Sequence, residues 1–183
     1  MEENYYHEHQ HLQFCAVHSM NNLFQDGTAC SKQQLDAICR ELNPHSLINP
    51  HKSILGIGNY DINVIMTFLS ERGYDTVWFD VRKSVESIDL SNVFGILMNR
   101  TRTVKVLSKS VTVPFLKHWY VMRKLKDDNY YNLDSKLTEP SYIGDEVKFR
   151  ALLTSELKKG VSHLLLVVTK EVSESRAWCV EET

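Results

Sequence analysis

The residues with the clearest chemical potential are a cysteine near the N-terminus and a histidine in the second half of the chain. Cys15 begins a segment whose apolar residues recur at the spacing of one helical face, so its thiol is expected at a helix N-terminus. A helix N-terminus and a nearby imidazolium both lower the pKa of a cysteine thiol from its ordinary value of about 8.5. We therefore interpret Cys15 as a nucleophile whose pKa is depressed.

Three further residues complete this interpretation. His118 opens a run of aromatic and β-branched residues about 100 positions after Cys15, and it is the expected base. Asn132 lies in the next run of this kind, and the short polar connection between the runs predicts a β-hairpin with neighbours about 5 Å apart. Asn132 is then expected to orient the imidazole. Gln10, five residues before Cys15, is expected to donate to an oxyanion together with the backbone N–H of Cys15.

Each residue also has an ordinary structural interpretation. A cysteine at a helix start more often packs, a lone histidine on an apolar strand is usually structural, and an asparagine beside a turn often serves that turn. The combination favours catalysis, because Gln-x4-Cys ahead of a helix is followed by His-Trp and Asn-Leu-Asp-Ser on paired strands.

The elements that must hold these residues are helical first and extended later. Ser31 and Gln34 form the capping-box pattern of a helix that stops at Asn43, and Asp61 can cap another that ends near Gly73. Because residues 45–59 between them have the composition of a loop, these helices predict a helical hairpin.

Aromatic and β-branched runs predict strands after Gly73. The expected strands cover residues 76–80, 93–98, 118–122, 130–133 and 163–169, with a helix over 145–159. This order predicts an α+β fold with a largely antiparallel sheet. We expect one domain over residues 1–170 and a polar tail over 171–183 that frays.

Composition narrows the classes of protein. The chain has 183 residues with 43% hydrophobic and 24% charged, which is typical of a globular domain. A net charge of -2 argues against a nucleic-acid binder, and no apolar run approaches the roughly 20 residues of a membrane span. The locally basic segment 100–117 alternates charges with Val and Ser, which indicates a solvated strand or loop rather than a phosphate site.

The four cysteines form no C-x-x-C pair, so neither a zinc site nor a disulfide framework is predicted. A metal site at His51 and the histidines at 7, 9 and 11 is a weak alternative, because these residues fall in segments without predicted structure. We expect no metal or organic cofactor. We also expect the protein to reside in a reducing compartment, which is the cytoplasm, with the nucleus as a second location.

Three strings carry a resemblance to a known family: HEHQHLQFCAVHSMNNL at residues 7–23, KHWYVMRKL at 117–125 and YYNLDSKL at 130–137. They resemble the Josephin family of deubiquitinating cysteine proteases, most closely its small stand-alone members, over nearly the whole chain. The resemblance implies a papain-like cysteine protease fold with a projecting helical hairpin beside the cleft. It also implies that Cys15 is the nucleophile, His118 the base, Asn132 the orienting residue and Gln10 the oxyanion donor.

The resemblance further implies an enzyme that hydrolyses isopeptide bonds at the ubiquitin C-terminus through a Cys15 thioester. Ile62 and Asn63 match positions that contact ubiquitin in the family, and Trp119 either walls the cleft or packs in the core. Ubiquitin and polyubiquitin chains are then the partners of a monomeric protein. The alternatives are a papain-like peptidase or transferase acting on another molecule, and a catalytically weak ubiquitin-binding module.

Overall fold

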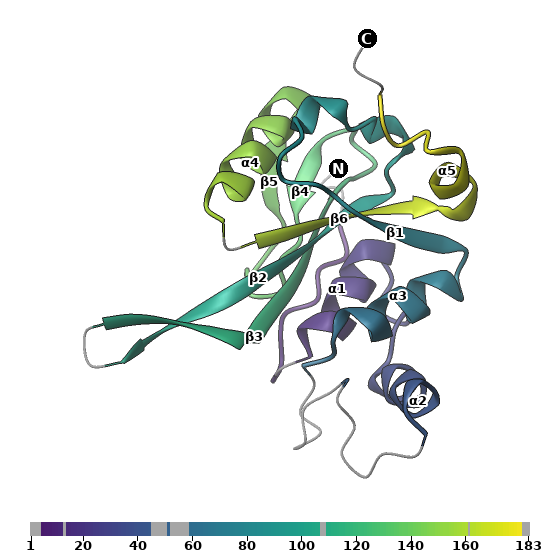
Figure 1. Ribbon diagram of the computed structural model, residues 1–183, viewed down its shortest axis with the longest axis vertical. Coiled ribbons are helices and arrows are strands. Elements are labelled where there is room, and N and C mark those ends of the chain that lie inside the picture. The colour runs from purple at the N-terminus through teal and green to yellow at the C-terminus, as the bar shows by residue number, and fades with distance from the viewer. Residues whose placement is uncertain are drawn as a thin grey trace.

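Helices and strands form an α+β arrangement in the computed structural model, which describes residues 5–12, 14–44, 51, 59–106, 109–160 and 162–180 (Figure 1). Side chains are described for these residues except 102–106 and 109–116. In the described part, six strands form one sheet in the order β1-β6-β2-β3-β4-β5, and all neighbouring strands pair antiparallel. The predicted α+β class with an antiparallel sheet is therefore confirmed.

The helices of the described residues are α1 (Cys15–Phe24), α2 (Lys32–Leu42), α3 (Ile62–Ser70), α4 (Glu146–Lys158) and α5 (Lys170–Ser175). The strands are β1 (Tyr74–Trp78), β2 (Gly95–Val106), β3 (Lys109–Lys124), β4 (Tyr130–Asn132), β5 (Ser141–Gly144) and β6 (Ser162–Thr169). Two short 3₁₀ helices, η1 (Val85–Ser87) and η2 (Leu90–Asn92), precede β2.

Side-chain caps set the starts of α2 and α3 as predicted. The Ser31 side chain accepts the backbone N–H of Gln34, whose side chain accepts the Ser31 N–H, so the capping box of α2 is complete. The Asp61 carboxylate caps α3 by accepting the backbone N–H groups of Asn63 and Val64. Helices α2 and α3 contact each other. The loop predicted between them lies mostly outside the described residues.

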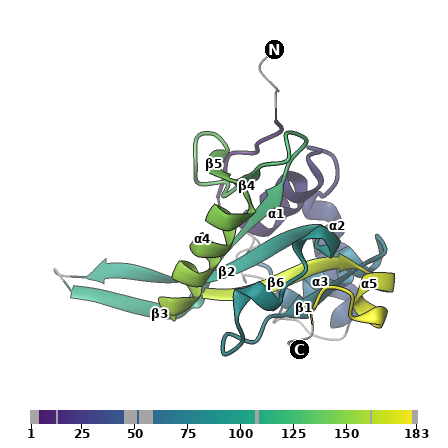
Figure 2. The ribbon, with the colours of Figure 1, turned by 90° about the horizontal axis from the view of Figure 1, so that it is seen from above.

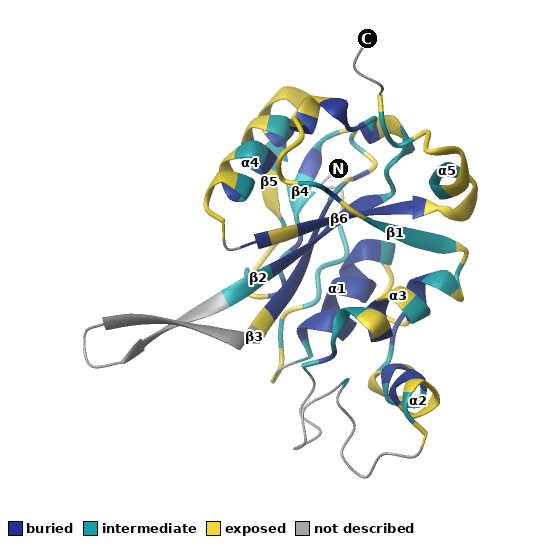
Figure 3. Ribbon diagram, viewed as in Figure 1, coloured by how far each residue is buried: buried dark blue, intermediate teal, exposed yellow. Residues whose placement is uncertain are grey.

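The central strands are buried on both faces. On β3, Trp119 and Val121 belong to the core that α1, α2 and α3 cover, whereas Tyr120 and Met122 belong to the core that α4 covers. This alternation follows from the two-residue period of a strand. Figure 1 shows α1, α2 and α3 gathered below the sheet and α4 above it, and Figure 3 shows the buried residues along the middle strands. His118 precedes Trp119 on β3 and its ring stacks on Tyr120, at the end of the buried part of this strand.

Strands β2 and β3 are much longer than predicted. Their backbones pair from Ile96 and Met122 out to Val106 and Lys109, with an irregularity after Thr101. Strand β6 accompanies β2 only between Gly95 and Arg100, so the rest leaves the sheet as a two-stranded ribbon (Figure 2). This ribbon contains the basic segment, and the side chains of residues 102–116 lie outside the description.

The predicted fraying of the tail is wrong as far as residue 180. Helix α5 follows β6, capped by Thr169. The Trp178 carbonyl accepts the backbone N–H of Asp89 at 2.8 Å, and the Val180 N–H donates to the Ser87 carbonyl at 2.8 Å. Backbone pairing to the η1 region thus holds the polar tail. Among the described residues, none of the helices has the length and apolar character that crossing a bilayer requires.

Candidate active site

Cys15 is the first residue of α1 and its side chain is buried, with 4% exposed. No side chain caps this helix, so backbone N–H groups of its first turn remain available. The N–H groups of Trp119 and Ala16 lie within hydrogen-bonding reach of the sulfur. The hydroxyl of Ser19 donates to the Trp119 carbonyl at 2.9 Å, which fixes α1 against β3. The thiol is thereby brought next to the residue that follows His118.

Burial raises the pKa of the Cys15 thiol, contrary to the depression expected from its place at a helix N-terminus. The N–H groups of Trp119 and Ala16 and the charge of Lys136 act in the opposite direction without overcoming it. Desolvation disfavours the thiolate more than one helix end favours it. Loss of the thiol proton therefore depends on a base.

His118 is buried, with 4% exposed, and carries a carboxylate partner. Its Nε2 lies 2.7 Å from Oδ1 of Asp134. The same oxygen accepts the backbone N–H of Lys136 at 3.0 Å. Burial by itself would raise the pKa of the Asp134 carboxyl, but the hydrogen bond and charge of His118 and the contacts of Lys136 hold it below its usual value. Asp134 thus stays ionised and orients the imidazole.

Asn132 does not occupy the position predicted for it. It pairs with Met122 on β3, four residues beyond His118, which is about 13 Å along a strand. Its Oδ1 accepts the backbone N–H of Asp134 at 3.0 Å. The hairpin was predicted correctly, but β4 ends at Asn132, and the chain then bends so that Asp134 reaches the imidazole. A carboxylate two residues after Asn132 was the available signal for this arrangement.

Gln10 lies beside the Asp134 loop. Its backbone N–H donates to the Ser135 carbonyl at 2.6 Å, whereas its side-chain Nε2 donates to the Leu12 carbonyl at 2.8 Å. Its Oε1 and the hydroxyl of Ser135 are buried and have no hydrogen-bond partner among the described residues. The structure places Gln10 near the centre but points its amide elsewhere, so its oxyanion role stays a prediction.

The segment that carries Gln10 is tied to α1 by buried polar groups. The Glu8 carboxylate pairs with His18 at 2.7 Å and accepts from Asn21 at 2.6 Å. Asn22 is fully buried, its Oδ1 accepts the Glu8 N–H at 2.7 Å, and its Nδ2 donates to the Leu133 carbonyl at 2.9 Å. Asn22 therefore joins the Gln10 segment to the Asp134 loop.

We expect Asn22→Ala to lower the free energy of unfolding by about 2–4 kcal/mol, because the Glu8 N–H and the Leu133 carbonyl would stay buried without partners. Denaturant unfolding measures this change. The exposed Gln33 of α2 provides a control, since Gln33→Ala should change stability by no more than about 0.5 kcal/mol. Equal stability of the two variants would show that Asn22 does not hold these segments together.

The predicted substrate-contacting residues are placed differently from one another. The first turn of α3 contains Ile62 and Asn63. Ile62 is partly buried and packs on the core, whereas Asn63 is exposed. Trp119 is 1% exposed, and its Nε1 donates to the Tyr60 carbonyl at 2.9 Å. Of the two interpretations of Trp119, the structure therefore supports core packing.

Tyr120 backs the imidazole on the side of α4. Its ring stacks on His118 with centroids 5.9 Å apart and planes inclined by 19°. The Tyr120 hydroxyl accepts from Arg100 at 3.1 Å, and Arg100 pairs with Glu156 of α4 at 2.6 Å. Burial raises the pKa of Tyr120 to about 12, so the hydroxyl stays neutral.

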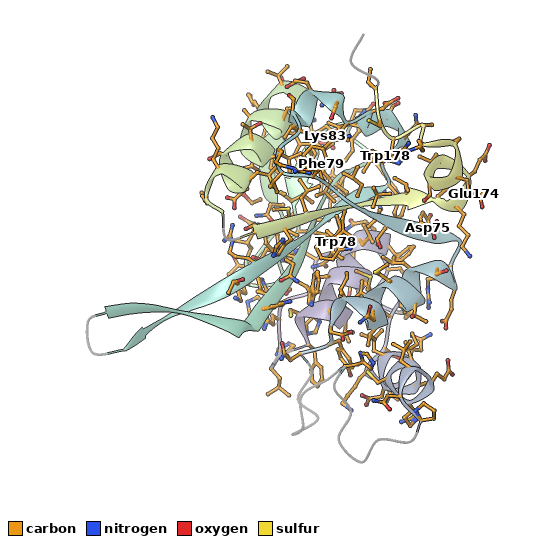
Figure 4. All side chains as sticks on the ribbon, viewed as in Figure 1. Asp75, Trp78, Phe79, Lys83, Glu174 and Trp178 are labelled. Atoms are coloured by element: carbon orange, nitrogen blue, oxygen red, sulfur yellow. The ribbon has the colours of Figure 1, made fainter. Side chains whose placement is uncertain are left out.

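Within the described part of the chain, no three His, Cys, Asp or Glu side chains are grouped so that they could hold a metal ion. His51 instead pairs with Asp61 at 2.7 Å, and His7 contacts the Leu137 carbonyl at 3.0 Å. A cavity of about 550 Å³ lies between the η1 region and the C-terminal segment, where Lys83 and Trp178 are labelled in Figure 4. Cys15 and His118 do not line it.

Comparison with known proteins places the chain in a family. The family described as Josephin matches residues 10–168. Human Josephin-2 is 44% identical over 173 residues, covering 94% of this chain and 90% of that protein. A Josephin-like protein of Drosophila melanogaster is 40% identical over 177 residues, covering 96% and 78%. Human ataxin-3 is 26% identical over 162 residues, covering 86% and 43%. The chain therefore belongs to the Josephin family.

Proposed function

We propose that this protein is a deubiquitinating thiol isopeptidase with a papain-like fold, whose catalytic unit spans residues 1–170. The observation that carries the proposal is the His118–Asp134 pair at 2.7 Å beside Trp119, whose N–H lies against the Cys15 sulfur. Membership of the Josephin family supplies the substrate class, the C-terminal tail of ubiquitin. Cys15 is the nucleophile, His118 the base, and Asp134 takes the orienting role that the sequence assigned to Asn132.

In the proposed reaction, Nε2 of His118 is engaged by Asp134, so Nδ1 exchanges the proton. The Cys15 thiol gives its proton to Nδ1 while the sulfur attacks the isopeptide carbonyl. The backbone N–H of Cys15 and a reoriented Gln10 amide donate to the resulting oxyanion. The C–N bond then breaks, and His118 protonates the departing lysine amine. Water activated by His118 hydrolyses the thioester and regenerates the thiol.

Substrate binding is assigned to the start of α3, where Asn63 is exposed next to Ile62. Helices α2 and α3 form the hairpin that projects beside the cleft and controls entry of the tail. We propose a monomeric enzyme of the cytoplasm and nucleus that acts on ubiquitin and polyubiquitin chains. The four cysteines are all free thiols, which supports a reducing compartment.

The proposal is tested by hydrolysis of a fluorogenic amide on the C-terminus of ubiquitin, compared with the same reporter on a related protein modifier. We expect the ubiquitin substrate to have a kcat/KM at least about tenfold higher. Equal cleavage of both would indicate a peptidase of another specificity. Binding of ubiquitin without turnover would favour the non-catalytic module.

A further inference from the structure

Asn99 of β2 is a buried polar residue beside the catalytic strand. Its side chain is 2% exposed, and its Oδ1 has no hydrogen-bond partner among the described residues. A buried carbonyl oxygen without a partner costs free energy that an apolar residue of similar size would avoid. The Asn99 side-chain oxygen therefore does not stabilise the free protein, and a donor for it would have to come from a binding partner.

Other buried asparagines of the same chain are satisfied. Asn21 accepts the Cys30 N–H at 2.7 Å and donates to Glu8 at 2.6 Å. Asn22 accepts and donates in the same way, as described above. Among the buried asparagines of the described residues, the unpartnered side-chain oxygen is thus specific to Asn99.

The position of Asn99 relates it to the nucleophile. Asn99 lies directly opposite Trp119 on β3, and residues opposite each other in an antiparallel pair share one face of the sheet. That face is the one covered by α1 and α3, and Cys15 belongs to its core cluster. The Trp119 N–H lies against the Cys15 sulfur, so Asn99 is one strand away from the reacting thiol.

The same face opens to solvent on the other side of Asn99. There Asn99 lies opposite His163 of β6, which is exposed. The Trp78 ring of β1 packs edge-on against His163 with centroids 5.8 Å apart, and Trp78 is 49% exposed. Trp78 is labelled in Figure 4. Asn99 therefore stands between an exposed aromatic pair and the strand that contacts Cys15.

Asn99 is about as buried as the two proposed catalytic residues, so its burial does not by itself exclude contact with a substrate. Cys15 and His118 are each 4% exposed, similar to Asn99. A substrate tail that reaches the thiol beside Trp119 comes within one strand of Asn99, which lies opposite Trp119. An extended peptide presents unpaired backbone N–H groups, which are the partners that an amide oxygen lacks here.

Resting on the function proposed above, we propose that Asn99 is a specificity-determining residue whose Oδ1 accepts a backbone N–H of the ubiquitin tail as the tail approaches Cys15. The interaction is made equally in the bound substrate and in the transition state. It therefore lowers KM and leaves kcat unchanged.

The test uses Asn99→Leu, which keeps the approximate size but removes the acceptor, and Asn99→Ala as a second variant. Both should raise KM for the ubiquitin C-terminal amide about tenfold with kcat within about twofold of the parent. Alkylation of Cys15 by iodoacetamide, a reagent without a tail, should proceed at the parent rate. Thermal stability should not fall in Asn99→Leu, because that variant removes an unsatisfied group.

The matched control is Thr76→Val. The Thr76 hydroxyl is also buried and has no hydrogen-bond partner in the described part of the chain, but it lies opposite Val167 at the β1 edge of the sheet. Its removal should therefore leave KM unchanged. An unchanged KM in both Asn99 variants would overturn the inference while leaving the proposed function intact. Lower stability or slower alkylation of Asn99→Leu would also overturn it, because the amide would then serve the fold. A parent protein without turnover would overturn the proposed function and this inference with it.

Discussion

Replacing Cys15 with alanine is expected to abolish hydrolysis of ubiquitin conjugates, a loss of at least about 10⁴-fold in kcat. The fold should persist, because alanine is smaller and is a good helix former at the start of α1. Turnover of di-ubiquitin by purified protein measures the loss, and circular dichroism verifies folding.

Cys179 supplies the control for this substitution. It is a free thiol of intermediate exposure in the C-terminal segment, outside the proposed centre, so Cys179→Ala should retain the parent activity. Turnover that persists in Cys15→Ala, or that disappears in Cys179→Ala, would remove Cys15 from the mechanism.

The second large effect concerns Asp134. Asp134→Ala should lower kcat/KM by about 10²- to 10⁴-fold, because the imidazole loses the group that fixes its orientation and stabilises its charge. Asn132→Ala should have a much smaller effect, since the Asn132 Oδ1 accepts the backbone N–H of Asp134 and acts on His118 through that residue. Steady-state kinetics of both variants decide between the two residues, and a larger loss in Asn132→Ala would restore the assignment made from the sequence.

Stability as a function of pH gives a second measurement on Asp134. Its pKa is lowered from an ordinary value of 3.8, so the folded state favours the carboxylate. The stability that this carboxylate contributes is present above about pH 4 and is lost as the pH falls through the lowered value. Asp134→Asn should therefore show a weaker decline of stability with acid than the parent does, measured by denaturant unfolding at several pH values.

Much of the fold was accessible from the sequence because its determinants are local. The side chains of Ser31 and Asp61 cap their helices whatever the remainder of the chain does. The lengths of β2 and β3 were not accessible, since Pro114 interrupts the strand pattern and the ribbon depends on pairing between distant segments. Strand β5 was missed because its four residues carry no alternating pattern.

The site shows the same division between local and tertiary information. The types and spacing of Cys15 and His118 were the basis for proposing nucleophilic chemistry. The partner of His118 depends on the residue at which β4 ends. Residue propensities do not determine a strand end to within one or two residues. The raised pKa of Cys15 arises from packing of α1 against β3, so a helix-end argument alone gave the wrong direction.

The most direct test of the central claim is to react the parent protein with ubiquitin carrying an electrophile at its C-terminus and to map the adduct by peptide mass spectrometry. We expect one ubiquitin per chain, attached to the Cys15 sulfur, and no adduct in His118→Ala under the same conditions. Attachment to Cys30, Cys39 or Cys179, or no adduct in the parent protein, would contradict a thiol activated by the His118–Asp134 pair.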